Sequence, residues 1–204
     1  MLLWSLALMV VVLSWAEPVS MPSTAAPGRQ VAAPAQPPPP RASPGTQAQP
    51  SMPRSAPTRL RIPEIGVDAP FIDLSIGPSG RLEAPPSDDV NLVGWFAGGV
   101  SPGQRGTAVV AGHLDTKTSP AVFARLSTVE PGNRIHISRR DGTTATFVVD
   151  TIENFPQNDF PDARVYADTA DPQLRLITCG GSYDHEKKQY TENTVVFAHL
   201  VTVT

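Results

Sequence analysis

The amino-acid sequence predicts an all-β domain with one or two short helices, preceded by a segment that cannot build a core. Short runs rich in β-branched residues recur between turn residues, and helical periodicity is confined to one short stretch. Of the 23 prolines, 12 lie before Thr58. We therefore expect one folded domain at residues 58–204, a length that can bury a core.

Seven runs of this domain have the composition of β-strands: residues 59–62, 71–74, 108–111, 134–138, 144–152, 174–178 and 194–203. The pair Asp141-Gly142 between two alternating runs is typical of a β-hairpin. Only residues 120–128 have a helical pattern, with Ser119 as N-cap before a proline in the first turn. Many short strands with few helices indicate a barrel or a sandwich.

Residues 17–57 are predicted to be a disordered linker. They contain almost no aromatic or β-branched side chains, so they cannot bury enough apolar surface to offset the entropy of ordering. Their proline content, including the run at residues 37–40, is typical of a semi-rigid, extended spacer.

Residues 1–16 carry the localisation signal. Residues 2–16 form an uncharged apolar run, shorter than the roughly 18 to 20 residues that a spanning helix needs. The run is typical of a signal peptide cleaved after Ala16, or of an uncleaved signal anchor. Either alternative exports the domain. The spacer favours the anchor, so we expect the protein on the extracellular face of the cell membrane, or secreted if cleavage occurs.

Composition excludes several function classes. The net charge is −3, and no Lys/Arg cluster provides the basic surface of a nucleic-acid-binding protein. No two histidines or cysteines have the spacing of metal ligands, which argues against a metal-dependent hydrolase. We expect no cofactor, and calcium dependence stays open. The one adjacent carboxylate pair, Asp88-Asp89, is explained as a solvated turn.

Cys179 and His113 are the candidates for chemistry. Each follows an apolar strand pattern at the point where the strand meets a loop, and two strand ends can meet at one rim of a barrel. An imidazole beside a thiol can generate the thiolate and later protonate a leaving amine, which is the chemistry of acyl transfer. The alternative is a buried small cysteine and a histidine with a structural partner. The remaining histidines have no comparable context: His136, His185 and His199.

Five segments resemble the sortase family, most closely its actinobacterial class F: TAVVAGHLD (107–115), VFARL (122–126), PGNRI (131–135), LRLITCGG (174–181) and NTVVFA (193–198). The resemblance runs from about Arg59 to the C-terminus. It implies an eight-stranded β-barrel outside a Gram-positive membrane.

The resemblance also implies an activity. Sortases cleave an LPXTG-like sorting signal near the C-terminus of secreted proteins, hold the product as a thioacyl enzyme, and pass it to an amine of a peptidoglycan precursor or a pilin. Cys179 corresponds to the nucleophile and His113 to the acid/base residue.

One family residue is missing. The family arginine that holds the oxyanion corresponds to Asn193, or in class F-like members to Thr191. We expect Asn193 to be the donor, since its amide offers two N–H groups. It can instead be a turn residue, and Thr191, Lys187, Lys188 or backbone N–H groups are then the alternative donors.

Two other functions stay open. The missing arginine is compatible with a catalytically weak sortase-like module that binds sorting signals or wall peptides. An L,D-transpeptidase-like peptidoglycan enzyme is the third possibility, although such enzymes carry their histidine and cysteine close together in an S-H-G-C type segment, whereas His113 and Cys179 are far apart in this sequence.

Overall fold

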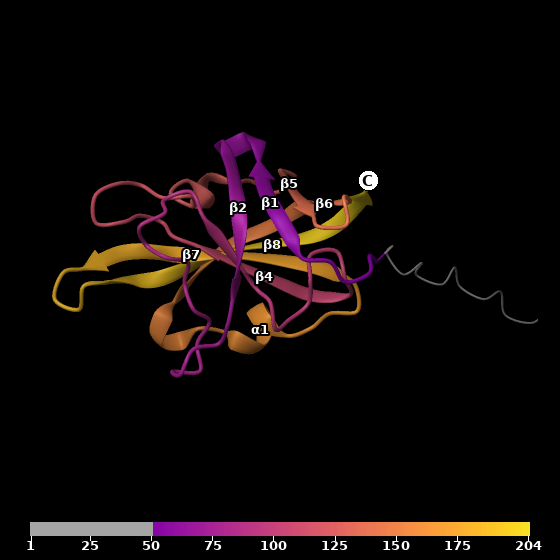
Figure 1. Cartoon of the computed structure of the whole chain (residues 1–204). Coiled ribbons are helices and arrows are strands. Elements are labelled where there is room, and N and C mark those ends of the chain that lie inside the picture. The colour runs from indigo at the N-terminus through magenta and orange to yellow at the C-terminus, as the bar shows by residue number, and fades with distance from the viewer. Residues whose placement is uncertain (1–50) are drawn as a thin grey trace, which may run out of the picture. The chain divides into compact units, whose positions relative to one another are not determined.

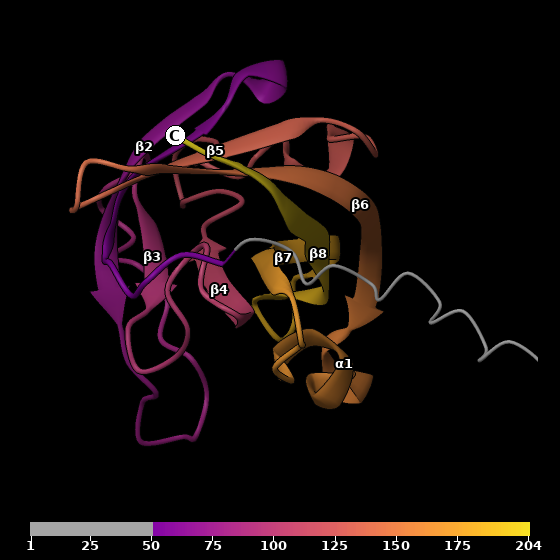
Figure 2. The same cartoon turned by 90° about the vertical axis from the view of Figure 1, so that its right-hand side faces the viewer.

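Eight strands close into a barrel in the computed structural model, which describes residues 51–204 (Figures 1 and 2). The strands are β1 (Pro57–Ile62), β2 (Val67–Leu74), β3 (Val93–Phe96), β4 (Gly106–Gly112), β5 (Arg134–Arg139), β6 (Thr144–Pro156), β7 (Pro172–Asp184) and β8 (Gln189–Val203). Their order around the barrel is β1-β2-β3-β4-β7-β8-β6-β5, and β1 pairs with β5 to close it. The all-β, eight-stranded prediction is confirmed.

Two neighbouring pairs in the barrel are parallel, β2 with β3 and β4 with β7, and the other pairs are antiparallel.

The sequence runs predicted seven of the eight strands and missed β3. This strand has only four residues and contains Gly94, where a Cβ would lie 2.3 Å from the Leu74 side chain. Glycine is needed there because β3 packs closely on β2, and glycine weakens the strand pattern.

Helices are few and short: η1 (Pro63–Ile65), η2 (Leu126–Thr128), η3 (Gln157–Asp159) and α1 (Asp162–Tyr166). The helix expected over residues 120–128 was wrong, because only η2 is helical there. Hydrogen bonds such as Leu126 N to Phe123 O and Thr128 N to Arg125 O connect residues three apart, so the segment consists of tight turns. These turns bury Phe123 and Leu126 in the core.

The barrel interior is filled by alternate residues of the strands. On β7, Leu174 and Leu176 point inward and are fully buried, as are Val196 and Ala198 of β8. Each large apolar side chain buried in this way stabilises the fold by about 1.5–3 kcal/mol. Phe147 is the largest strand residue in this core.

A second apolar cluster covers the outer face of β4, β7 and β8. Its buried members are Val109, Ile177, Val195 and Phe197 from the strands, with Val165 from α1. Figure 2 shows α1 beside β7 and β8. This part of the sheet is therefore buried on both faces, which explains why its strand sequences are apolar without interruption.

The packed part of the chain includes residues before Thr58. Met52 is 6% exposed, and its N–H donates to Gly103 O at 2.8 Å. The guanidinium of Arg54 donates to Gly99 O and Ala97 O at 2.7 and 2.6 Å. The signal segment at 1–16 and residues 17–50 of the predicted linker lie outside the described residues. Among residues 51–204, no helix is long and apolar enough to cross a bilayer.

Candidate functional site

The register of β4 and β7 brings His113 to Cys179. The two strands are parallel, and the last paired residues are Ala111 and Ile177. Continuing this register by two residues places His113 beside Cys179, on the face that carries the outer apolar cluster. The glycine before His113 is required, because a Cβ at Gly112 would lie 2.6 Å from the Phe123 ring.

Asn193 lies opposite Cys179 on the next strand. The two residues are direct cross-strand partners of the antiparallel β7–β8 pair, so their side chains are on the same face of the sheet. All three are half-buried. The structure therefore brings the three predicted site residues to the same part of three adjacent strands. His113 follows the end of β4 as predicted, but β7 continues to Asp184, so the prediction that Cys179 ends its strand was wrong.

The imidazole of His113 is oriented by a backbone carbonyl. Its Nε2 is 2.7 Å from Pro85 O, in the connection between β2 and β3. A carbonyl only accepts, so Nε2 carries the hydrogen and donates it, which leaves the lone pair on Nδ1. Nδ1 is then the atom that can take a proton from a thiol.

The surroundings of the Cys179 thiol favour its protonated form. Burial raises the pKa of Cys179, the carboxylate of Asp115 raises it further, and a backbone hydrogen bond opposes both effects. Cys179 is the only cysteine of the chain. Because the thiolate is the nucleophilic form, this cysteine needs a base at neutral pH.

A carboxylate and a phenol form a second feature of the site. The Tyr190 hydroxyl donates to Asp115 Oδ2, and this bond, followed by burial, raises the pKa of Tyr190 to about 12. Tyr190 is on β8 and pairs with Tyr183 of β7, with ring centroids 5.2 Å apart. Neither Asp115 nor Tyr190 was identified from the sequence. The one available signal was the position of Asp115, two residues after His113.

The amide of Asn193 is oriented by Gln157 of η3. Gln157 Nε2 donates to Asn193 Oδ1 at 3.3 Å. The Asn193 Nδ2 group has no acceptor within residues 51–204 and can donate to a substrate. Sequence reasoning did not find Gln157, since it lies 36 residues from Asn193.

The alternative donors have other partners or positions. Thr191 Oγ1 accepts from Ser182 N at 3.2 Å. Lys187 Nζ is 3.7 Å from Asp184 Oδ2, in the turn of the β7–β8 hairpin that extends beyond the barrel in Figure 1. Lys188 is in the same turn.

Arg175 does not replace the missing arginine. Its Nη1 donates to Gln173 Oε1 and Leu174 O at 3.0 and 3.1 Å, toward the start of β7 and away from Cys179. The guanidinium lies 4.4 Å from the centroid of the Phe197 ring, and burial lowers the pKa of Arg175 to about 10.

Aromatic side chains extend the outer apolar cluster along the strands that carry the site. Phe155 contacts Phe160 and Phe197 edge to face, at centroid distances of 5.9 and 6.3 Å. Arg164 of α1 forms an ion pair with Glu153 and lies over the Phe155 and Phe197 rings. Ile177 and Val195 connect this apolar surface to Cys179 and Asn193.

An open cavity of about 490 Å³ lies beside the chain that follows His113, and Leu114 is the first residue of its lining. Its lining comes from the loop after β4: Leu114, Asp115, Thr116, Ser119, Pro120 and Ala124. Within residues 51–204, no group of three or more His, Cys, Asp or Glu side chains could hold a metal ion.

The sortase domain family matches residues 60–201 of the chain. Among solved structures, the chain is similar to sortase A of Listeria monocytogenes, with 15% identity, a TM-score of 0.55, and coverage of 73% of this chain and 88% of that one. No curated protein sequence matches it.

Two further structures show the same fold. Sortase C1 of Streptococcus agalactiae has 21% identity and a TM-score of 0.53, covering 71% of this chain and 68% of that one. A sortase D5 transpeptidase of Clostridium perfringens has 19% identity and a TM-score of 0.52, covering 72% and 79%.

Proposed function

Since the chain belongs to the sortase family of cysteine transpeptidases, we propose that it cleaves an LPXTG-like sorting signal of secreted proteins through a thioacyl enzyme on Cys179 and transfers the acyl group to an amine. The observation that supports this proposal is the parallel β4–β7 pairing, whose last partners, Ala111 and Ile177, each come two residues before His113 and Cys179, the only cysteine of the chain. The acceptor is an amine of a peptidoglycan precursor or of a pilin.

The first step is acylation. His113 Nδ1 takes the proton of the Cys179 thiol, and the thiolate attacks the carbonyl carbon of the scissile peptide bond. The tetrahedral intermediate then collapses: the C–N bond breaks, His113 gives its proton to the leaving amine, and a thioester remains on Cys179. The hydrogen bond from Nε2 to Pro85 O keeps the imidazole in the required tautomer.

The second step releases the product. The acceptor amine attacks the thioester carbonyl and passes a proton to His113. The C–S bond breaks, and the sulfur takes the proton back as the thiol is restored. The protein is then ready for another cycle.

Asn193 is proposed as the donor to the oxyanion. Its position opposite Cys179 and the bond from Gln157 to its Oδ1 support this role, because Nδ2 is then directed away from Gln157. A single asparagine donor of this kind contributes roughly a hundred to a thousandfold in rate. A neutral amide adds no positive charge near the thiol, so the thiolate depends on His113.

The sorting signal is proposed to bind along the outer apolar cluster. A peptide with apolar residues near the scissile bond can cover the Phe155 and Phe160 rings, which are half-buried at the edge of this cluster. Arg164 of α1 pairs with Glu153 and lies over the Phe155 and Phe197 rings, which supports a surface formed before the peptide arrives.

The assignment to sortase class F and the attachment of the domain to the cell membrane are also proposals. The segment LRLITCGG at residues 174–181 supports class F. The apolar run at residues 2–16 and the proline-rich residues after it support a domain tethered outside the cell membrane.

Mass spectrometry of the purified protein with a library of sorting-signal peptides tests the proposal. We expect an acyl adduct on Cys179 with at least one peptide, and none in Cys179→Ala. His113→Ala should acylate several orders of magnitude more slowly, as expected when a nucleophile loses its base. His136→Ala, a variant of a histidine on β5, is the matched control and should acylate normally.

A binding module is the second candidate function. The positions of the family arginine carry Thr191 and Asn193, and the pKa of the Cys179 thiol is raised. If every peptide binds and none gives an adduct, the protein recognises sorting signals without cleaving them.

A further inference from the structure

The negative charge of the Asp115 carboxylate hinders formation of the Cys179 thiolate, with which acylation begins. The carboxylate is exposed, two residues after His113, and its charge acts on the Cys179 sulfur. A negative charge at this place opposes thiolate formation, so it does not assist acylation. In the thioester the sulfur is neutral, and the penalty disappears. The same charge then attracts any cation that approaches the acyl group.

The surroundings of Asp115 have the chemistry of an ammonium site. Thr116 and Ser119 line the same open cavity, and their hydroxyl oxygens are 3.3 Å apart. The Thr116 oxygen already accepts from Thr118 N and Ser119 N, so the acceptors left for an ammonium in this cavity are the Asp115 carboxylate and the Ser119 hydroxyl. The cavity, of about 490 Å³, is large enough for the chain that carries the amine.

Two tyrosines of the β7–β8 hairpin flank this site. The Tyr190 hydroxyl holds Asp115 by donating to Oδ2, and a carboxylate keeps further lone pairs for a second donor. Tyr183 packs edge to face on Tyr190 and is 44% exposed. Aromatic faces attract ammonium groups, which strengthens the selection of a cation.

We propose that Asp115, with the hydroxyl of Ser119, binds the ammonium of the acceptor amine beside the thioester on Cys179. This inference rests on the proposed function and adds the site of the second substrate. The ligand class is a primary alkylammonium, from a peptide N-terminus or from a lysine-type side chain. The ammonium first loses one proton to water, and the free amine attacks the carbonyl carbon. His113, neutral after acylation, takes the second proton from the nitrogen and gives it to the sulfur as the C–S bond breaks.

The test compares acceptors on the acyl enzyme of the full chain. Triglycine supplies an α-ammonium, Nα-acetyl-lysine amide supplies an ε-ammonium, and hydroxylamine supplies a nucleophile that is uncharged at pH 7.5. Mass spectrometry measures the transfer product and the hydrolysis product for each acceptor concentration. A preference for triglycine would indicate a peptide N-terminus as the natural acceptor, and a preference for Nα-acetyl-lysine amide would indicate a lysine-type side chain.

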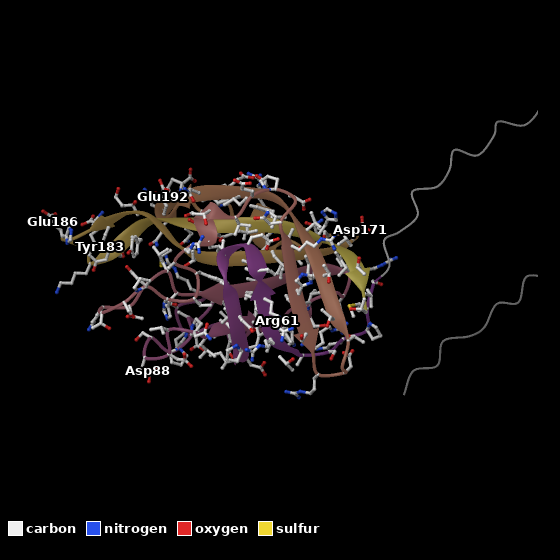
Figure 3. The ribbon with its side chains drawn as sticks, turned by 90° about the horizontal axis from the view of Figure 1, so that it is seen from above. Arg61, Asp88, Asp171, Tyr183, Glu186 and Glu192 are labelled. Atoms are coloured by element: carbon white, nitrogen blue, oxygen red, sulfur yellow. The ribbon has the colours of Figure 1, made fainter. Side chains whose placement is uncertain are left out.

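Asp115→Asn is expected to raise the KM of at least one ammonium acceptor about ten to a hundredfold, the range for a lost charge-assisted hydrogen bond. Hydrolysis and transfer to hydroxylamine should not fall, because removing the Asp115 charge favours the Cys179 thiolate, which is the leaving group in both reactions. The amide keeps an oxygen for the Tyr190 hydroxyl, so the loop should be preserved. Asp171→Asn is the matched control, since Asp171 precedes β7 at the end far from Tyr183 and the hairpin (Figure 3).

Two results would overturn the inference. The KM of both ammonium acceptors could stay unchanged in Asp115→Asn, or transfer to hydroxylamine could fall by the same factor. Both leave the proposed function intact, because they are measured on an acyl enzyme that has formed. Failure of the original protein to form that acyl enzyme would instead remove the proposed function.

Discussion

At Cys179, the protein raises the pKa of its proposed nucleophile. Burial is the larger cause and the Asp115 carboxylate the second. This combination differs from the usual activation of a cysteine by nearby positive charge, which lowers the thiol pKa. The partner histidine must therefore remove the proton during attack, and the bond from its Nε2 to Pro85 O leaves Nδ1 available for this task.

A pH titration of thiol reactivity checks this environment. The rate of Cys179 alkylation by iodoacetamide should reach half its maximum at a higher pH than the rate of a cysteine in an unfolded peptide. Asp115→Asn should move this midpoint to lower pH, because one of the two causes is removed, and it should remain above the peptide value because burial remains. An unchanged midpoint in Asp115→Asn would show that the carboxylate does not act on the sulfur.

Asn193→Ala tests the oxyanion donor. The acylation rate should fall at least about tenfold, because the intermediate loses an N–H donor. The free energy of unfolding should change by less than about 1 kcal/mol, the usual scale for a residue outside the core. Stopped reactions analysed by mass spectrometry give the rate, and urea unfolding gives the stability. Near-normal acylation in Asn193→Ala would show that the oxyanion donor is another group, either a backbone N–H or Thr191.

Gln157→Glu tests how the Asn193 amide is oriented. A carboxylate accepts hydrogen bonds only, so it should attract Nδ2 and turn Oδ1 toward the substrate. Acylation should then fall by at least as much as in Asn193→Ala. Gln157→Ala, which offers no competing acceptor, is the control and should retain more activity than Gln157→Glu. The reverse order of the two variants would contradict the assigned orientation.

Among the elements, the segment before β1 has a structural role that its composition did not indicate. Met52 is buried, Arg54 lies over Trp95 at 5.2 Å, and the guanidinium of Arg139 donates to Pro53 O. The Arg139 side chain is fully buried, and its Nε and Nη1 have no partner in residues 51–204. Removing Pro53 would leave this guanidinium without its backbone acceptor.

A comparison of two truncations measures this role. A fragment of residues 58–204 should be less stable than one of residues 51–204 by about 1.5–3 kcal/mol for the burial of Met52 alone. The lost acceptor of Arg139 should add to this difference. Urea unfolding followed by circular dichroism gives both values. Equal stability would show that residues 51–57 contribute nothing to the barrel.

For the whole molecule, the proline-rich residues are expected to lie outside the folded unit. Limited proteolysis should leave a fragment that begins close to Ser51 and ends near Thr204, because the packed side chains begin at Met52. Mass spectrometry identifies its ends. Protection that extends back into residues 37–40 would contradict the linker prediction.

The sequence by itself determined the fold class, and it predicted Cys179, His113 and Asn193 as site residues. Strand periodicity and turn residues are local properties, so seven of the eight strands could be predicted from them. The segments around His113 and Cys179 resemble a family, and this resemblance predicted without coordinates that the two residues act together. The prediction of a helix over residues 120–128 was wrong, because it was based on a weak local pattern and the structure has mostly turns there.

Only the tertiary structure decided which distant groups meet. Asp115 and Tyr190 are 75 residues apart, Gln157 and Asn193 are 36 apart, and Pro85 and His113 are 28 apart. These contacts depend on β4 pairing with β7 and on loops that cross the same rim, and no local pattern encodes either. A hydrogen bond needs its two atoms within a few tenths of an ångström of an ideal distance, and only the closed barrel fixes positions that closely.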